Sequence, residues 1–492
     1  MTATLLRNAR LRGADRPTDL LIVDGVIRSI GVARHDLMGI ADLETLDLEG
    51  RYTGPGLWDQ HVHVGQWALS SSRLDISAAT SAAEAVDLVR RHLDSGPHTP
   101  GTILVGHGFR DGLWPEAPTP QLLDAVEHPV ALVSGDVHTV WSNAAALRQV
   151  GLSAADWWLR EQPAFDLNVR LSTVATEQLD ALVRDAARRA AARGVVGVGD
   201  FEFDDAAGAW LRRFADGFRG LRVRAQVYPA HRELARERGI RTGAALGDSG
   251  GLLTGGEYKL FTDGSLNTRT AWCDDPYPGL EGPEAHGLPT YGDGELLAAA
   301  RAGLDAGLIP TIHAIGDRAV AAALDVFAQL GSGGSIQHVQ LMRDDDAPRF
   351  AALGVRASVQ PEHAMDDRDV TDHYWAGRGG RAYAFRRLLE AGAVLEFGSD
   401  APVAPLDPWV TMDAAVTRSR DGREPWHPEQ AIGVEAALIA SQGGVRALAE
   451  GAAADVVVTD ADPLTAPLRG MPVYATMLAG TWTHAPGSGA GG

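Results

Sequence analysis

The sequence predicts an α/β protein built on a TIM-type (β/α)₈ barrel, with a small β-sandwich domain formed by both chain ends. Three observations carry this prediction: eight short apolar strand-like runs, Ala- and Leu-rich helical runs between most of them, and strand-like segments at both ends of the chain. Strands that alternate with helices are typical of parallel βα units, and eight such units close into a barrel.

The barrel elements follow one another in a regular order. The expected strands span 56–64, 195–203, 221–229, 257–265, 309–317, 335–341, 355–363 and 393–403. The expected helices include 81–95, 176–193, 294–306, 317–330 and 382–391. Each strand is rich in apolar residues, as expected for strands that are buried on both faces.

Segments near both chain ends indicate a second, smaller unit. Residues 3–7 and 20–31 alternate polar and apolar residues, and the second segment contains an Asp-Gly hairpin signal. Residues 454–464 and 474–484 have the same strand-like character. Because chain termini often lie close together, these four segments are expected to share one small sheet.

We therefore expect two domains and one insertion. Residues 1–52 and 420–492 are assigned to the discontinuous β-sandwich, and residues 53–419 to the barrel. Residues from about 97 to 175 do not fit the barrel pattern, although they contain four tryptophans. They are expected to form an insertion between the first and second barrel strands that covers the site.

Composition limits the kind of partner. The 492 residues are 45% hydrophobic and 22% charged, as in ordinary globular proteins, and the net charge of −20 without a basic cluster argues against nucleic acid and anionic membranes as partners. One cysteine excludes an intrachain disulfide. No signal peptide and no run of about 18 apolar residues is found, so we expect a cytoplasmic protein that binds a small molecule. Composition leaves a homo-oligomer open.

Candidate metal ligands occur on five of the eight strands. His61 and His63 are two residues apart, so in a strand both side chains point to the same side. The fourth, fifth, sixth and eighth strands contribute one candidate each, in the order Lys259, His313, His338 and Asp400. All lie toward the C-terminal parts of their strands, where barrel active sites are built, and imidazole and carboxylate groups suit Zn²⁺.

Each of these residues also has an ordinary structural interpretation. A single buried histidine is more often a core residue than a ligand, and an aspartate between serine and alanine-proline is often a turn or helix cap. Lys259 is the only lysine among 44 lysine and arginine residues, and it could be a buried cation paired with Asp263 or Glu257. The order of the candidates, strand after strand, favours a metal site.

The motifs resemble those of the amidohydrolase superfamily, and within it the amidohydrolase 3 (YtcJ-like) group, which includes N-substituted formamide deformylases. The resemblance covers nearly the whole chain. It rests on GPGLWDQHVHV, DVHTVWSNAAAL, YKLFTDGSLNTRTA, TIHAIGDRAV, QHVQL, VQPEHA, GSDAPVAPLDPW and GAAADVVVTDADPL. The resemblance also implies a β-sandwich made from both chain ends.

The resemblance implies a binuclear metal centre. It matches His61, His63, Lys259 and Asp400 to ligands of the first metal, and Lys259, His313 and His338 to ligands of the second. Two Zn²⁺ ions are expected, with Mn²⁺, Co²⁺ or Fe²⁺ as alternatives. Lys259 would carry CO₂ as a carbamate that bridges the metals, a reaction that needs a neutral amine and is closed to arginine.

The implied chemistry is hydrolysis of a non-peptide, amide-type C–N bond by a metal-bridging hydroxide. Asp400 would act as general base and then general acid, and His138 would stabilise the oxyanion. The family usually has glycine where this chain has Val137. Candidates for substrate binding are Asp136, Trp141, Arg269, Trp67, Trp114 and His363.

Three other functions fit part of the pattern. A mononuclear deaminase could use the same fold, although deaminases of this superfamily generally lack the carbamate lysine. An ester or lactone hydrolase could use the same hydroxide. A binding protein could retain the fold without catalysis, but the sequence keeps all six candidate ligands.

Overall fold

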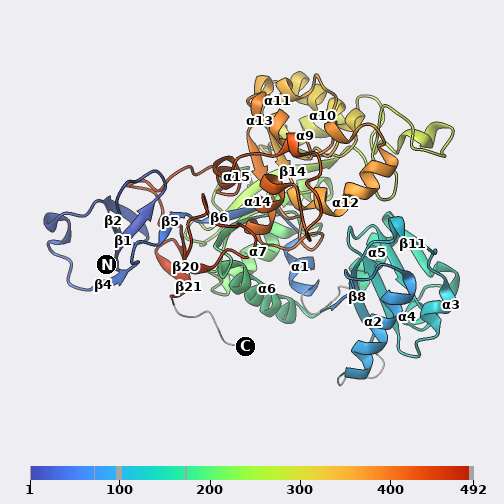
Figure 1. The fold of residues 1–492 in the computed structure, drawn as a ribbon, viewed down its shortest axis with the longest axis horizontal. Helices are drawn as coiled ribbons and strands as arrows, with labels where there is room; N and C mark the ends of the chain where they lie inside the picture. Colours follow the sequence, from blue (N-terminus) through green and yellow to red (C-terminus); the bar gives the residue numbers. More distant parts are fainter. Residues whose placement is uncertain (1, 71–72, 96–101, 172–173, 487–492) are drawn as a thin grey trace.

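The computed structural model describes residues 2–70, 73–95, 102–171 and 174–486. Its strands form three sheets: one made by the chain ends, one that curves into a barrel, and one in the insertion (Figure 1). Among these residues, no helix is both long enough and apolar enough to cross a membrane.

The central sheet confirms the predicted barrel. Its eight strands lie in the order β18-β17-β16-β15-β14-β13-β12-β6, and all seven neighbouring pairs are parallel. Their bounds are β6 Leu57–Val62, β12 Val195–Asp200, β13 Arg222–Val227, β14 Leu253–Phe261, β15 Pro310–Ala314, β16 Gly334–His338, β17 Val355–Val359 and β18 Leu395–Phe397.

The sheet closes where the chain leaves its first and last strands. The Asp400 amide donates to the His61 carbonyl at 2.7 Å, and the His63 amide donates to the Ala401 carbonyl at 2.9 Å. Gly398 permits this approach, because a Cβ there would lie 2.7 Å from the His61 backbone nitrogen. The closure brings the first and last predicted ligand strands together.

Most of the strands are shorter than predicted or shifted along the chain, and two of the differences concern β14 and β17. β14 begins at Leu253 rather than at Glu257, and β17 ends at Val359 instead of continuing to His363. The second difference has a clear cause: Pro361 lacks an amide proton but suits the first turn of a helix, so helix α12 (Pro361–Tyr374) begins there.

Helix α10 (Asp317–Leu330) shows why the predicted helices form. Ala319, Ala323 and Phe327 recur every four residues and are buried, so one face packs on the barrel. Gly331, with φ of 65°, ends the helix. The other barrel-side helices are α1 Val64–Ser70, α6 Thr176–Ala191, α7 Ala206–Ala215, α8 Arg232–Glu237, α9 Glu295–Asp305, α11 Ala347–Leu353, α13 Phe385–Glu390, α14 Pro408–Thr417 and α15 Val434–Ala440.

The chain ends share one sheet, as predicted. Antiparallel pairing of β5 with β19 joins the N-terminal strands to the C-terminal ones. The predicted Asp-Gly turn is present, since Asp24 and Gly25 have φ of 48° and 82° between β2 and β3. The strands are β1 Ala3–Leu11, β2 Thr18–Val23, β3 Val26–Ile30, β4 Leu43–Asp47, β5 Tyr52–Pro55, β19 Val456–Thr459, β20 Val473–Leu478 and β21 Thr481–His484.

The insertion has its own five-stranded sheet and forms a lobe beside the barrel (Figure 1). We call the described residues from 73 to 171 the cap unit. Its elements are β7 Leu74–Asp75, α2 Ala82–Ser95, β8 Leu104–Phe109, α3 Pro120–Asp124, β9 Val130–Ser134, β10 Thr139–Ser142, α4 Ala144–Gln149, β11 Trp158–Arg160 and α5 Gln162–Leu171.

The cap unit includes more of the chain than the predicted insertion. Residue 97, the predicted start, lies outside the described residues, but β7 and α2 precede it and already belong to the cap unit. Val86 and Val89 of α2 pack with Leu132 and Trp141 in one hydrophobic cluster. Helix α2 was expected among the barrel helices, and its apolar face shows that this assignment was wrong.

Candidate active site

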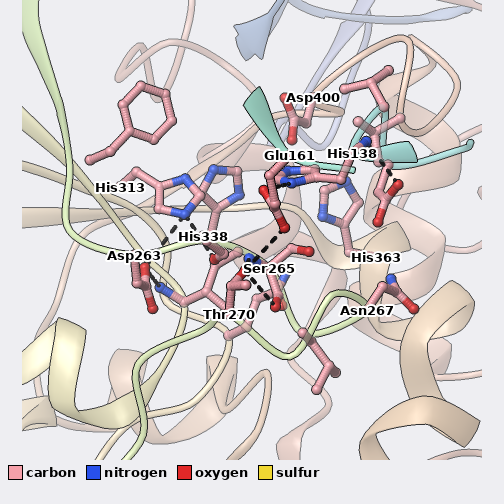
Figure 2. A pocket seen from close by; sticks show the side chains of 18 of the residues that line it. His138, Glu161, Asp263, Ser265, Asn267, Thr270, His313, His338, His363 and Asp400 are labelled. Atoms are coloured by element: carbon pink, nitrogen blue, oxygen red, sulfur yellow. Dashed lines mark hydrogen bonds and ion pairs between the residues drawn. The ribbon is translucent and has the colours of Figure 1, made fainter. Parts of the chain in front are cut away.

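Four imidazoles and one carboxylate meet at the carboxyl ends of the barrel strands. Oδ1 of Asp400 lies 3.4 Å from Nε2 of His61 and 3.3 Å from Nε2 of His63. One ligand atom each from His61, His338 and Asp400 lie within 4.8 Å of one another. The ring centroids of His313 and His338 are 4.5 Å apart. All six predicted ligands line one cavity, and Figure 2 shows three of them, His313, His338 and Asp400.

Gln337 fixes the orientation of His61. Nδ1 of His61 lies 2.7 Å from Oε1 of Gln337, whose amide nitrogen donates to the hydroxyls of Thr311 and Ser335 at 2.8 and 3.1 Å. Those two donations identify Oε1 as the acceptor, so His61 carries its proton on Nδ1. The lone pair on Nε2 then faces Asp400 and is free to bind a cation.

His313 is oriented by a different acceptor. Its Nε2 lies 3.3 Å from the Gly264 carbonyl oxygen and 3.5 Å from a carboxylate oxygen of Asp263. Two acceptors on one side place the ring proton on Nε2, which leaves Nδ1 as the nitrogen with a lone pair. Burial and the charge of Lys259 lower the pKa of His313 to about 3, so the imidazole is neutral.

Lys259 projects into this cluster, and its Nζ lies 4.8 and 5.0 Å from the ring centroids of Phe201 and Phe261. The residue is 1% exposed, and within the described residues its Nζ has no hydrogen-bond partner. Burial lowers the pKa of the Lys259 amine to about 7, against the opposing charges of Asp400 and Glu257. A neutral amine is therefore accessible near neutral pH.

The two proposed ion-pair partners of Lys259 are occupied elsewhere. Asp263 accepts hydrogen bonds from the backbone amides of Trp272, Ile315 and Gly316 at 2.8 to 3.0 Å. Glu257 accepts from the Ser335 hydroxyl at 2.7 Å and pairs with Arg356. The buried ion-pair interpretation of Lys259 thus has no support in the contacts.

The donor set fits a divalent metal centre. Burial raises the pKa of Asp400, but the neighbouring imidazoles His61, His63 and His338 outweigh it and hold the pKa well below its usual value. Within the described residues, Nδ1 of His63 and Nδ1 of His338 are buried without hydrogen-bond partners, like Nζ of Lys259. Buried polar atoms rarely remain unpartnered, and a cation among them would satisfy nitrogen and carboxylate ligands together.

The cap unit contributes the opposite side of the site. Nδ1 of His138 lies 2.8 Å from Oε2 of Glu161. Asp136 lines the cavity, as predicted, but its Oδ1 also accepts from the Ser134 hydroxyl and the His138 amide, which orders the loop. Val137 has φ of 60°, the left-handed region that favours glycine. Glycine would adopt this conformation without strain.

The ligands and the cap residues line one cavity of about 530 Å³. Its apolar wall contains Phe203, Phe165 and Phe261, with ring centroids 6.3 Å from Phe203 to each of the other two. A second wall is polar and includes Arg110, whose Nη2 donates to Asp366 at 2.9 Å. His363, a candidate for substrate binding from the sequence, also lines this cavity.

Four predicted substrate residues do not line the cavity, so their assignments were wrong. Trp141 is fully buried in the core of the cap unit, and Trp114 packs against the same cluster. Trp67 packs against the barrel core. The Arg269 guanidinium lies 5.7 Å from the ring centroid of Tyr374, outside the cavity lining. Large apolar rings and a stacked guanidinium gain more from packing than from solvent exposure.

Several cavity residues were missed from sequence. Glu161, Arg110, Phe165 and Phe203 belong to none of these motifs, whereas Phe261 lies in the Lys259 motif but was not recognised as a cavity residue. The sole available signal for Phe203 was its position just after a barrel strand, where active-site residues gather.

The barrel, the inward ligand set and the cap define a metal-dependent hydrolase of the (β/α)₈ class. Residues 44–480 match the model of the amidohydrolase family, so the chain belongs to that family. It is 26% identical to the putative amidohydrolase YtcJ of Bacillus subtilis strain 168, with 92% of each chain covered. It is 25% identical to the N-substituted formamide deformylase of Arthrobacter pascens, with 98% of each covered.

A solved structure agrees with this assignment. An uncharacterized metal-dependent hydrolase from Pyrococcus horikoshii OT3 superposes with a TM-score of 0.79 at 27% identity, covering 96% of this chain and 100% of the other. The protein is thus a hydrolase of the amidohydrolase family that uses a divalent metal.

Proposed function

We propose that this enzyme hydrolyses a non-peptide amide bond at a binuclear metal centre that includes carboxylated Lys259. The observation that carries the proposal is the Lys259 amine, buried and without a hydrogen-bond partner in the described chain, among four imidazoles and Asp400. His61, His63, Lys259 and Asp400 would hold one metal, and Lys259, His313 and His338 the other. Bound there, two divalent cations would lower the pKa of a water toward about 7 and polarise the substrate carbonyl.

The carbamate follows from the state of Lys259. A neutral amine attacks CO₂, an N–C bond forms, and one proton leaves the nitrogen for solvent. The product is an anionic carboxylate-like group with two oxygens, which suits two neighbouring cations better than one amine does. Arginine would remain charged and could not react.

The residues of the chain divide the remaining work. Asp400 is ionised and lies beside the predicted metal ligands, so it would accept the proton of the attacking water and pass it to the leaving nitrogen. His138 faces the cavity from the cap unit and would donate to the carbonyl oxygen as negative charge develops there.

The apolar wall indicates what the amide carries. Phe203 is 38% exposed, and Phe165 and Leu288 line the same cavity. An exposed aromatic wall gains free energy when an apolar group of the substrate covers it. We therefore propose N-formyl or N-acyl amines with an apolar amine portion as the first substrates to examine.

The carbamate can be tested with unusual clarity because Lys259 is the only lysine. Protein purified with Zn²⁺ and equilibrated with ¹³C-bicarbonate should show one carbamate carbon resonance that the Lys259→Arg variant lacks. The variant retains the chain's α-amine and controls for its reaction. Metal analysis should give two ions per chain. One ion with no carbamate signal would instead indicate a mononuclear enzyme.

The bond type is tested with a panel of N-formyl amines, N-acyl amines, aminated heterocycles and lactones, each assayed with Zn²⁺, Mn²⁺ or Co²⁺. The proposal expects turnover of amides above all others. Ammonia release from the heterocycles alone would identify a deaminase, and lactone opening without amide turnover would identify an ester or lactone hydrolase.

A further inference from the structure

We propose that Glu161 is the positioning residue of this site: it holds His138 as a hydrogen-bond donor to the substrate and links that donor to the barrel loop after the Lys259 strand. The inference rests on the proposed function, because it concerns how His138 would meet a developing oxyanion. It also makes a claim about the resting protein that can be measured without turnover.

The inference rests on a short hydrogen bond between His138 and Glu161. Oε2 of Glu161 lies 2.8 Å from Nδ1 of His138. Since a carboxylate only accepts, His138 keeps a proton on Nδ1, and Nε2 is the ring nitrogen left for a molecule in the cavity. The ring is also held by Phe165, whose ring lies edge-on at 4.8 Å. Glu161 therefore sets both the orientation of the imidazole and the nitrogen that meets substrate.

The second carboxylate oxygen of Glu161 crosses to the barrel. The Thr270 hydroxyl donates to Oε1 at 3.3 Å, and Thr270 lies in the loop that follows β14, the strand of Lys259 (Figure 2). Thr268 continues the chain of hydroxyls at 2.7 Å from Thr270, and Ser265 lies 2.9 Å from Thr268. The Glu161 side chain thus joins His138 of the cap unit to the loop that follows the Lys259 strand.

The surrounding charges decide whether Nε2 donates or accepts. Burial lowers the pKa of His138, but the hydrogen bond that its Nδ1 donates to Glu161 and the charges of Asp136, Glu161 and Asp400 outweigh it, so the pKa is raised above its usual value. His313 also interacts electrostatically with His138, and its imidazole is neutral. A doubly protonated ring donates from Nε2, whereas a neutral ring with its proton on Nδ1 can only accept there.

The test compares Glu161→Gln with wild type in the Zn²⁺-loaded enzyme. Glutamine keeps the length and can still accept from Nδ1, but it lacks the charge, so His138 loses its second proton at lower pH. We expect kcat to fall about tenfold at pH 8, with the descending limb of its pH profile moved to lower pH and KM nearly unchanged. Asp166→Asn, an equal change of charge on α5 without a contact to His138, should leave the limb in place. An unmoved limb in Glu161→Gln overturns the inference.

A double-mutant cycle shows whether Glu161 acts through His138. In the His138→Asn background, Glu161→Gln should have no further effect on kcat, because the group it positions is absent. Equal losses in both backgrounds would mean that Glu161 only supports the fold.

A measurement without substrate separates the inference from the proposed function. The sequence has 16 histidines, and the ring resonance that His138→Asn removes is the one to follow in an NMR titration. Its midpoint should move to lower pH in Glu161→Gln, even if no amide is hydrolysed. An unchanged midpoint overturns the inference, whereas a moved midpoint without amide turnover refutes only the proposed function.

Discussion

The barrel and the cap unit line the same cavity, but they hold their side chains differently. His61, His313 and Lys259 lie on barrel strands, and the side chains of His61 and His313 are 2% and 7% exposed. Gln337 orients His61, and the Gly264 carbonyl orients His313. In the cap unit, His138 lies in a loop, and its side chain is 18% exposed and held by the single carboxylate of Glu161. We infer that the barrel supplies rigid metal ligands, and the cap unit supplies adjustable substrate contacts.

The two regions meet through polar contacts and through the rings of Phe165 and Phe203. Arg110 pairs with Asp366, and Thr270 donates to Glu161. Near α1, the side chains of Asn168 and Gln66 lie 3.4 Å apart. Polar contacts of this kind tolerate small relative movements more readily than apolar ones. Substitutions in the barrel and in the cap unit should therefore differ in their effects on metal content and on kcat.

The largest expected effect is on the barrel side. Lys259→Arg preserves a positive charge but cannot form a carbamate, so activity should fall at least about a thousandfold and bound metal should drop below two per chain. Metal analysis and kcat/KM on the same preparation measure both. Wild-type activity in a folded Lys259→Arg protein would refute the carbamate.

The matching change in the cap unit is His138→Asn. Loss of one oxyanion donor should lower kcat by about a hundredfold while the metal content stays at the wild-type value. The two regions would then differ in the effect of substitution on metal content: the barrel variant loses metal, and the cap-unit variant does not. A fall in metal content in His138→Asn would break the comparison.

A third change tests whether the rigidity of the barrel ligands matters. Gln337→Leu removes the acceptor that orients His61, so metal affinity should weaken by about 10- to 100-fold in a chelator competition. Gln360→Leu is the control, since Gln360 is equally buried at 2% and its amide atoms have no partner within the described residues. Equal losses in both variants would indicate a general packing effect.

Phe203→Ala tests the apolar wall. Removing the ring should raise KM about tenfold for N-formyl amines with a large apolar group and change it little for N-formyl methylamine, because only the former covers the wall. Steady-state kinetics with the two substrates gives the ratio. Equal changes for both would show that Phe203 serves the fold.

The smallest expected effect is on stability. Val137 has φ of 60°, which destabilises the folded state by about 1–2 kcal/mol for a β-branched residue. Glycine avoids this strain, but it loses more backbone entropy on folding, which costs about 0.5–1 kcal/mol. Val137→Gly should therefore raise the free energy of unfolding by up to about 1 kcal/mol in urea. Val133→Gly, within strand β9, should lower it. A loss of stability in Val137→Gly would mean that the packing of Val137 against the cluster of Val133 and Val140 outweighs the backbone strain.

Local patterns predicted most of the barrel. The eight strands were found because buried parallel strands are continuous apolar runs, and their order placed six candidate ligands near the strand ends. Helix α2 was misassigned, since an amphipathic pattern shows which face is buried but not which sheet covers it. The tryptophan and Arg269 assignments failed for the same reason: a side chain's surroundings are set by distant segments.

By itself, the sequence determined the periodicities of the barrel elements, the strand character of the terminal segments and the order of the candidate ligands, because these depend on residues near one another along the chain. Tertiary structure decided which of the chemically suitable groups act together. His61 meets Gln337 across 276 positions of sequence, and Glu161 meets Thr270 across 109. Such contacts leave no local pattern, because the free energy that holds them comes from packing whole elements against one another.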